Sequence, residues 1–223
     1  MPSPTDTSHD TDASSLLYDK LLDYLLVALL VVEGIVVGWL GVTALTEIHR
    51  SFADEIARDV VANSERPLGL SEQALADAIY SLAVWGSGGL VAVGVVLIVG
   101  GLWFYRYRSG VRERVADGRR PPRWHAPLLG GVLATALAFV PFAQVGGGAV
   151  AGYLSDRSSI VDGVLAGVVF GAPAYVLWGA LAVGALVTGT PTLAVFVVFA
   201  VLVYVAVDVV FAAIGGLLAG LLT

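Results

Sequence analysis

The sequence predicts an all-α protein, a polytopic bundle of about five transmembrane helices. Of its 223 residues, 57% are hydrophobic and 13% are charged, whereas soluble domains carry about 25% charged residues. The mean hydropathy is +0.85, and the apolar residues gather in long runs. A helix needs about 20 apolar residues to cross the hydrocarbon core of a bilayer. Too few charges remain to cover a soluble surface, so we expect lipid to cover part of it.

The chain begins with a polar segment and then a first apolar run. Residues 1–14 are rich in Ser, Thr and Asp and predict a disordered acidic tail. This tail lacks the basic residues of a signal peptide, so we expect the following run to stay in the protein as a membrane anchor. Residues 22–44 form the first predicted span, with Glu33 near its middle and Asp23 at its start.

Residues 45–79 predict a small extracellular helical hairpin. Leu45, Ile48, Phe52, Ile56 and Val60 recur at three- and four-residue steps, which is the period of an amphipathic helix. We expect ion pairs at i,i+4 spacing on its solvent side, Arg50 with Asp54 and Asp54 with Arg58. Residues 66–69 break the pattern, and Ser71 is the predicted N-cap of a second short helix over 72–79.

The second span, 80–105, is followed by an arginine-rich segment that sets the predicted orientation. Residues 106–125 contain seven arginines and two acids. Under the positive-inside rule this loop is cytoplasmic, which places the N-terminus in the cytoplasm and residues 45–79 outside. The arginines could also contact anionic lipid; they are Arg106, Arg108, Arg112, Arg114, Arg119, Arg120 and Arg123.

Residues 126–223 predict a three-span module that follows the two-span module at 15–105. We expect spans at 127–154, 162–187 and 192–222. The span at 127–154 contains Pro141, so it is either one kinked helix or two half-helices that double back. These two alternatives place the C-terminus on opposite sides of the membrane. Pro173 lies within the span at 162–187. Such prolines either kink helices or mark the broken helices of transporters.

Glycines at four-residue spacing predict close helix packing. Residues four apart lie on one helix face, and glycine lets two backbones approach. These contacts serve packing within one chain or a homo-oligomer formed through the face of Gly163, Gly167 and Gly171. The predicted packing glycines are Gly34, Gly38, Gly148, Gly152, Gly163, Gly167, Gly171, Gly216 and Gly220.

Two acids, Glu33 and Asp208, lie near the centres of predicted spans, where an ionised carboxylate is costly. No base lies in any span to balance them. They are therefore candidates, with Gln144, for an intramembrane proton or Na⁺ site; otherwise each is a protonated carboxyl group bonded to a neighbouring helix. For Asp23 and Asp162, which lie at span ends, an interfacial or N-capping role is sufficient.

The sequence contains no signature of an enzyme. It has no cysteine and three scattered histidines, His9, His49 and His125. HExxH, GxSxG and phosphate-binding loop motifs do not occur in it. We therefore expect no catalytic residue, cofactor or metal site, and no nucleic-acid partner.

One part of the chain resembles a known family. Composition, with acidic polar segments and arginine in place of lysine, favours a haloarchaeal origin over a high-GC bacterium. The run Phe139-Val140-Pro141-Phe142, then Gly146 to Leu154, then Asp162-Gly163-Val164-Leu165-Ala166-Gly167, is similar to small haloarchaeal membrane proteins catalogued as a domain of unknown function. The likeness covers residues 127–223; the two upstream spans and the hairpin depart from it. It implies a multi-pass archaeal membrane protein and no activity.

Two functional hypotheses follow. The first is a non-enzymatic structural or interaction component of the cell membrane, acting through helix packing and the external hairpin. The second is a small ion- or proton-coupled transporter or channel that uses Glu33 and Asp208.

Overall fold

The computed structural model describes residues 19–63, 70–155, 158–189 and 191–222. The tail predicted at 1–14 and the break predicted at 66–69 lie outside these ranges. The described chain is helical, with short connections between helices. In order, the helices are α2 (Lys20–Glu47), α3 (Arg50–Asn63), α4 (Glu72–Ala116), α5 (His125–Ala136), α6 (Ala143–Tyr153), α7 (Ser159–Val187) and α8 (Pro191–Leu222).

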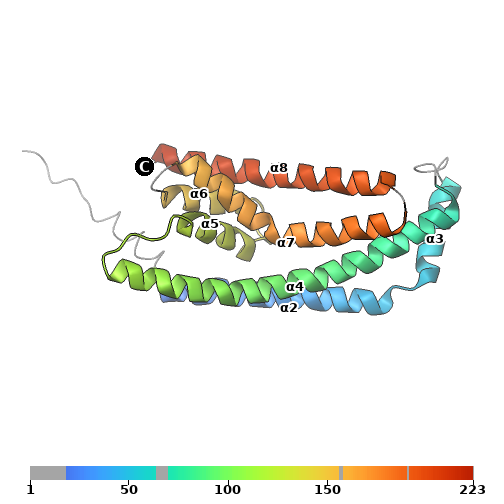
Figure 1. Ribbon diagram of the computed structural model, residues 1–223, viewed down its shortest axis with the longest axis horizontal. Coiled ribbons are helices and arrows are strands. Elements are labelled where there is room, and N and C mark those ends of the chain that lie inside the picture. The colour runs from blue at the N-terminus through green and yellow to red at the C-terminus, as the bar shows by residue number, and fades with distance from the viewer. Residues whose placement is uncertain (1–18, 64–69, 156–157, 190, 223) are drawn as a thin grey trace, which may run out of the picture.

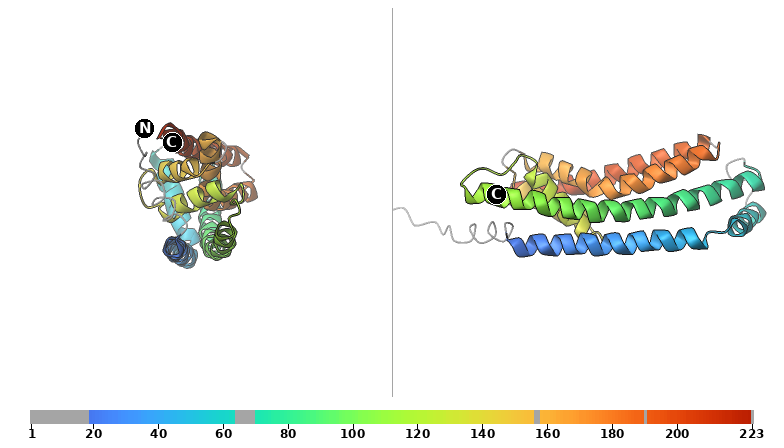
Figure 2. Two further views of the ribbon diagram at one scale, coloured as in Figure 1. Left: turned by 90° about the vertical axis from the view of Figure 1, so that its left-hand side faces the viewer. Right: turned by 60° about the horizontal axis from the view of Figure 1, so that its bottom comes forward.

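The long helices run side by side along one axis (Figure 1). Helix α2 packs against α4, and α7 packs against α8 (Figure 2, right). We call the end at which α4 finishes and α5 begins the arginine end, and the end that carries α3 the hairpin end. The start of α2 and the last turn of α8 both lie at the arginine end (Figure 1).

Four helices, α2, α4, α7 and α8, are long and apolar enough to cross a membrane. They contain 28, 45, 29 and 32 residues, and each contains one predicted span (22–44, 80–105, 162–187 or 192–222). At about 1.5 Å per residue, each exceeds the roughly 30 Å hydrocarbon core. Their exposed faces are lined with Leu, Val, Ile and Phe, as expected of surfaces that face lipid.

The single span expected over 127–154 is not formed, so the described chain has four long apolar helices, not five. Helices α5 and α6 have 12 and 11 residues, which is about 18 Å or less and too short to cross. They pack against each other and return to the arginine end (Figure 1). The predicted alternative, two half-helices that double back, describes this segment.

Pro141 and a left-handed residue explain the reversal between α5 and α6. Proline lacks an N–H and cannot continue the helix, and the next residue, Phe142, has φ of 63°. Turn hydrogen bonds, such as Val140 N–H to the Leu137 carbonyl at 2.8 Å, satisfy the backbone here. By contrast, Pro173 lies inside the continuous helix α7, which bends (Figure 1).

Helix α4 extends beyond the predicted span at both ends. It begins at Ser71, the predicted N-cap, whose hydroxyl accepts a hydrogen bond from the Ala74 N–H at 3.2 Å. The expected short helix at 72–79 is therefore the first part of α4. At the other end, residues 106–116 of the predicted arginine loop are also helical. Phe104, Arg108 and Val111 recur on one buried face there, so tertiary packing continues the helix past the first arginines.

Helix α3 contains Phe52, Ile56 and Val60 of the predicted amphipathic helix, whereas Leu45 belongs to α2 and Ile48 is the C-cap of α2. The ion pairs of α3 also differ from those expected. Arg50 pairs with Asp77, and Arg58 lies 3.7 Å from Glu72. Both acids belong to α4, so these two ion pairs hold α3 to its neighbour rather than forming within it.

Several predicted packing glycines lie where two helices approach closely. A Cβ added to Gly34 would lie 2.8 Å from Ile98 Cγ1, and one on Gly152 would lie 2.9 Å from Gly216 Cα. On α7, a Cβ on Gly163 would meet Gly216 Cα at 3.0 Å and one on Gly167 would meet Ala212 Cβ at 2.9 Å. Because α8 of the same chain covers this part of the Gly163 face, a homo-oligomer through it stays a prediction that requires α8 to move.

Candidate functional site

A polar contact joins α6 to α8 inside the bundle. Asp208, near the middle of α8, is 2% exposed. The Gln144 Nε2 donates a hydrogen bond to Asp208 Oδ1 at 3.2 Å. Tyr204, one turn earlier on α8, directs its hydroxyl at the same carboxyl group. Oδ2 keeps no hydrogen-bond partner within normal distance among the described residues.

The α5–α6 reversal is what brings Gln144 to this place. Gln144 is the second residue of α6, directly after the left-handed Phe142, and α6 packs along α8. The Tyr175 hydroxyl of α7, near the Pro173 bend, is buried and also has no hydrogen-bond partner in the described part of the chain. Polar groups from α6, α7 and α8 therefore gather around one carboxyl group.

Glu33, the third predicted site residue, does not contact Asp208 directly. It lines a pocket of about 380 Å³ with Thr135 of α5, Pro173 of α7 and Tyr204 of α8. Tyr204 therefore lines this pocket and also reaches Asp208. Glu33 lies near the middle of α2 and Asp208 near the middle of α8, and Asp208 does not line this pocket.

This arrangement suits a proton or a monovalent cation better than a transition metal. No group of three or more His, Cys, Asp or Glu side chains that could hold a metal ion occurs among the described residues. Carboxylate, amide and phenol oxygens are the hard donors that small oxygen-seeking cations prefer. A protonated Asp208 would avoid the cost of a charge in an apolar setting.

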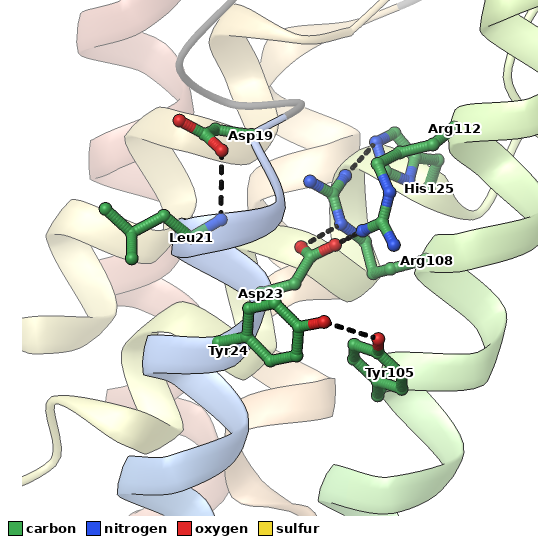
Figure 3. Close-up of polar contacts among 8 residues, drawn as sticks. All are labelled: Asp19, Leu21, Asp23, Tyr24, Tyr105, Arg108, Arg112 and His125. Carbon is green, nitrogen blue, oxygen red and sulfur yellow. Dashed lines mark hydrogen bonds and ion pairs between the residues drawn. The ribbon is translucent and has the colours of Figure 1, made fainter.

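A second polar cluster lies at the arginine end and joins α2, α4 and α5 (Figure 3). Asp23 and Arg108 are both 0% exposed, and Arg108 Nε donates to Asp23 Oδ1 at 2.7 Å. Arg112 pairs with the other oxygen of Asp23, and Arg108 Nη1 lies 3.0 Å from His125 Nε2. We call these four residues the buried arginine cluster. Its two guanidinium groups outnumber its one carboxylate, so it carries an excess of one positive charge.

The Arg108 contact defines the state of His125, which is the first residue of α5. A guanidinium only donates hydrogen bonds, so Nε2 must accept and the neutral ring carries its hydrogen on Nδ1. Burial, and then the charge of Arg108, lowers the pKa of His125 to about 4. The imidazole is therefore neutral at neutral pH.

The sequence did not reveal this cluster. Asp23 was expected at an interface or N-cap, but Asp19 caps α2, its side chain accepting from the Leu21 N–H at 2.9 Å. Arg108 and Arg112 were assigned to orientation and His125 to no role. The one available signal is the spacing of Arg108 with Phe104 and Val111, which puts that arginine on an apolar helix face.

Comparison with known protein families gives a match to the C-terminal part of the chain. Residues 124–222 match the model of a family described as a family of unknown function (DUF5518). This range agrees with the expected resemblance over 127–223, while the haloarchaeal origin stays a prediction. No curated protein matches the chain, and neither does any solved structure. The matched segment holds both Gln144 and Asp208, whereas Glu33, Asp23 and Arg108 belong to the part upstream.

Proposed function

We propose that this chain is a non-enzymatic multi-pass membrane protein that carries protons or a small monovalent cation, with Asp208 as the binding group. The observation that carries the proposal is the Gln144–Asp208 hydrogen bond, made by a re-entrant helix pair at the middle of α8. Irregular backbone at membrane depth is tolerated where protein buries it or where it lines a cavity. Discontinuous helices near the midplane form the ion sites of many transporters.

The surroundings of Asp208 favour a binding role over a purely structural one. A carboxyl group that serves packing alone would be satisfied by its neighbours. Here Asp208 Oδ2 and the Tyr175 hydroxyl both lack a hydrogen-bond partner among the described residues. A proton or cation at the carboxyl group would use these oxygens. The pocket shared by Glu33 and Tyr204 would provide a route between the two acids.

We assign the arginine end to the cytoplasm. Arginines exceed acids in residues 106–125, and positive charge near the ends of spans favours the cytoplasmic side. The start of α2 and the last turn of α8 would then be cytoplasmic, and α3 would lie outside.

Flux measurements in proteoliposomes test the proposal. We expect wild-type protein to dissipate an imposed pH or Na⁺ gradient, read by an internal dye, faster than empty liposomes do. Asp208→Asn removes the titrating group and should lower the rate by about tenfold or more, a loss of about 1.4 kcal/mol or more. Glu33→Gln should lower it less, because Glu33 contacts the pocket and not Asp208.

Asp59→Asn is the matched control, since it removes one acid from the exposed face of α3. Size-exclusion profiles and thermal unfolding establish that all three variants fold. The transport proposal fails if wild-type flux equals that of empty liposomes, or if Asp208→Asn transports at the wild-type rate. The structural role would then be the remaining hypothesis. One observation favours it: Phe52 on α3 is 57% exposed at the hairpin end, although two ion pairs hold that helix in place.

A further inference from the structure

A polar pocket lies at the arginine end, away from Asp208. The connection between α4 and α5, the end of α6 and the first turn of α7 enclose about 320 Å³. This volume is at the small end of the range for ligand pockets, roughly 300 to 1,000 Å³. Arg120, Arg123, His125 and Asp162 supply its polar side chains, and Leu154 supplies part of an apolar wall.

Asp162 provides a buried hydrogen-bond acceptor at this pocket. It is 3% exposed, and its Oδ1 has no hydrogen-bond partner in the described part of the chain. A buried acceptor without a donor costs free energy. A ligand that brings a hydroxyl or another hydrogen-bond donor would satisfy this oxygen.

The remaining features of the pocket favour an anion. Helices α5 and α7 both begin here without a side-chain cap. In α5 the His125 and Leu128 N–H groups bond to carbonyls and Pro127 has none, so the Ala126 N–H, at the pocket wall, is the one this turn offers among the described residues. The free N–H groups at a helix N-terminus carry partial positive charge and favour anionic ligands. Among the described residues, two guanidiniums and one carboxylate, that of Asp162, line the pocket, an excess of one positive charge. This positive surplus stands in a chain whose net charge is −6.

The buried arginine cluster supports the wall of this pocket. His125 lines the pocket and is also held by Arg108, at 3.0 Å. Through it the pocket adjoins two more guanidiniums that share one carboxylate, Asp23. Since these side chains are buried and paired, they hold positive charge in a fixed position without adjusting to a ligand.

We infer that this pocket binds a phosphate group that carries hydroxyl substituents, as in the head group of an anionic membrane lipid. Arg120, Arg123 and the start of α5 would hold the phosphate oxygens, and Asp162 would accept from a hydroxyl. The pocket lies at one end of the apolar helices, where head groups lie if those helices span a bilayer. Free phosphate has the same oxygens but no hydroxyl substituent for Asp162, so the experiment includes it.

Binding to the full-length protein in detergent tests the inference, with the dissociation constant measured by native mass spectrometry or calorimetry. The probes are dihexanoyl-phosphatidylglycerol, dihexanoyl-phosphatidylcholine, which lacks hydroxyl donors, and inorganic phosphate. We expect the glycerol lipid to bind about tenfold or more tightly than the choline lipid. Arg120→Ala with Arg123→Ala should weaken its binding by a similar factor.

Arg106→Ala with Arg114→Ala is the matched control, because it removes two exposed arginines of the same segment that do not line the pocket. This double variant should bind within about twofold of wild type. Asp162→Ala should lower the preference for the glycerol lipid over the choline lipid, since the acceptor for the hydroxyl is lost. Thermal unfolding without lipid verifies that each variant is folded.

Inorganic phosphate distinguishes the two sources of the ligand. If it binds with the same dependence on Arg120 and Arg123, the pocket takes free phosphate; if it does not bind, the pocket takes lipid. Both results support a phosphate site. The inference is overturned if none of the probes binds, or if the two double arginine variants lose the same affinity. Transport by Asp208 is measured separately, so either proposal can fail without the other.

Discussion

The two innermost carboxylates of this chain are accommodated in different ways. Asp23 is 0% exposed and pairs with two guanidinium groups, whereas Asp208 is 2% exposed and meets an amide and a phenol. Removing one partner of a buried pair typically costs about 3–5 kcal/mol. The pairing of Asp23 with two arginines is therefore a sufficient structural reason for a buried carboxylate at this position. Among the described residues no positive charge contacts Asp208, so a proton or cation is the simplest way to neutralise it.

His125 predicts a pH dependence of stability. Its pKa is about 4 in the folded protein and about 6.5 in an unfolded chain. Below pH 6.5 the unfolded chain therefore binds a proton that the folded chain does not, and stability falls as the pH decreases toward 4. Between pH 7 and pH 5 the expected loss from this group is about 2 kcal/mol. Thermal or denaturant unfolding in detergent at the two pH values measures it.

His125→Gln should remove this dependence, because its amide oxygen can accept from Arg108 but does not titrate. The control is His49→Gln, which changes an exposed histidine next to α3. If His125→Gln is as sensitive to acid as wild type, another group causes the loss of stability. The assignment of His125 as a neutral, buried side chain would then be wrong.

At the level of the elements, the α5–α6 pair shows how a short apolar segment becomes a re-entrant hairpin. The two halves approach through small residues: a Cβ on Gly147 would lie 2.7 Å from Ala134 Cβ. Several N–H and carbonyl groups of the turn bond to each other, which lowers the cost of burying unwound backbone. The hairpin is stabilised by this contact and by packing on α7 and α8.

The α2–α4 contact gives a prediction about one glycine. A Cβ on Gly94 would lie 2.8 Å from both Cα and N of Gly38, whereas one on Gly100, in the same helix, would meet nothing within 4 Å. Gly94→Ala must push the two backbones apart, so we expect the free energy of unfolding to fall by about 1–3 kcal/mol.

Gly100→Ala should leave stability unchanged or raise it by up to about 1 kcal/mol, because alanine favours helix over glycine. Unfolding of the two variants in one detergent compares the same chemical change at a packed and an open position. Equal effects would show that α2 and α4 do not approach at Gly94.

At the scale of the whole molecule, the α5–α6 hairpin changes the number of times that the chain would cross a membrane. Five crossings would put residue 222 on the opposite side from residue 113, whereas four crossings and a re-entrant pair put both on one side. The last turns of α4 and α8, which contain these residues, both lie at the arginine end (Figure 1). The side on which the C-terminal helix ends is therefore a direct readout of the architecture.

Cysteine labelling measures that readout, and the chain contains no cysteine to interfere. Single variants Ser51→Cys, Glu113→Cys and Leu222→Cys each place a thiol at an exposed position. We expect a membrane-impermeant maleimide to label the last two from one side of the membrane and Ser51→Cys from the other. Labelling of Glu113→Cys and Leu222→Cys from opposite sides would contradict the four-crossing fold.

Much of the architecture was predictable because it depends on local properties. Four apolar runs are long enough to form membrane helices wherever they pack, and Ser71 caps its own helix through a bond to Ala74. Gln144 and Asp208 were named as candidates for one site because both are polar residues in apolar runs, and whether they form a functional site stays a prediction. The exclusion of enzymatic and cofactor chemistry stays a prediction from sequence.

The sequence by itself predicted long apolar helices at the four places where the structure has them, because apolar length is read along the chain. It also predicted a fifth span over 127–154, which does not form. Tertiary structure decided the reversal at Pro141, the sharing of Asp23 by Arg108 and Arg112, and the place of His125 beside them. The cluster joins residues about 85 positions apart, since Arg108 and Asp23 meet only where α2 packs against α4. Whether a charged residue is buried and paired depends on which helices touch, and that is a property of three-dimensional packing.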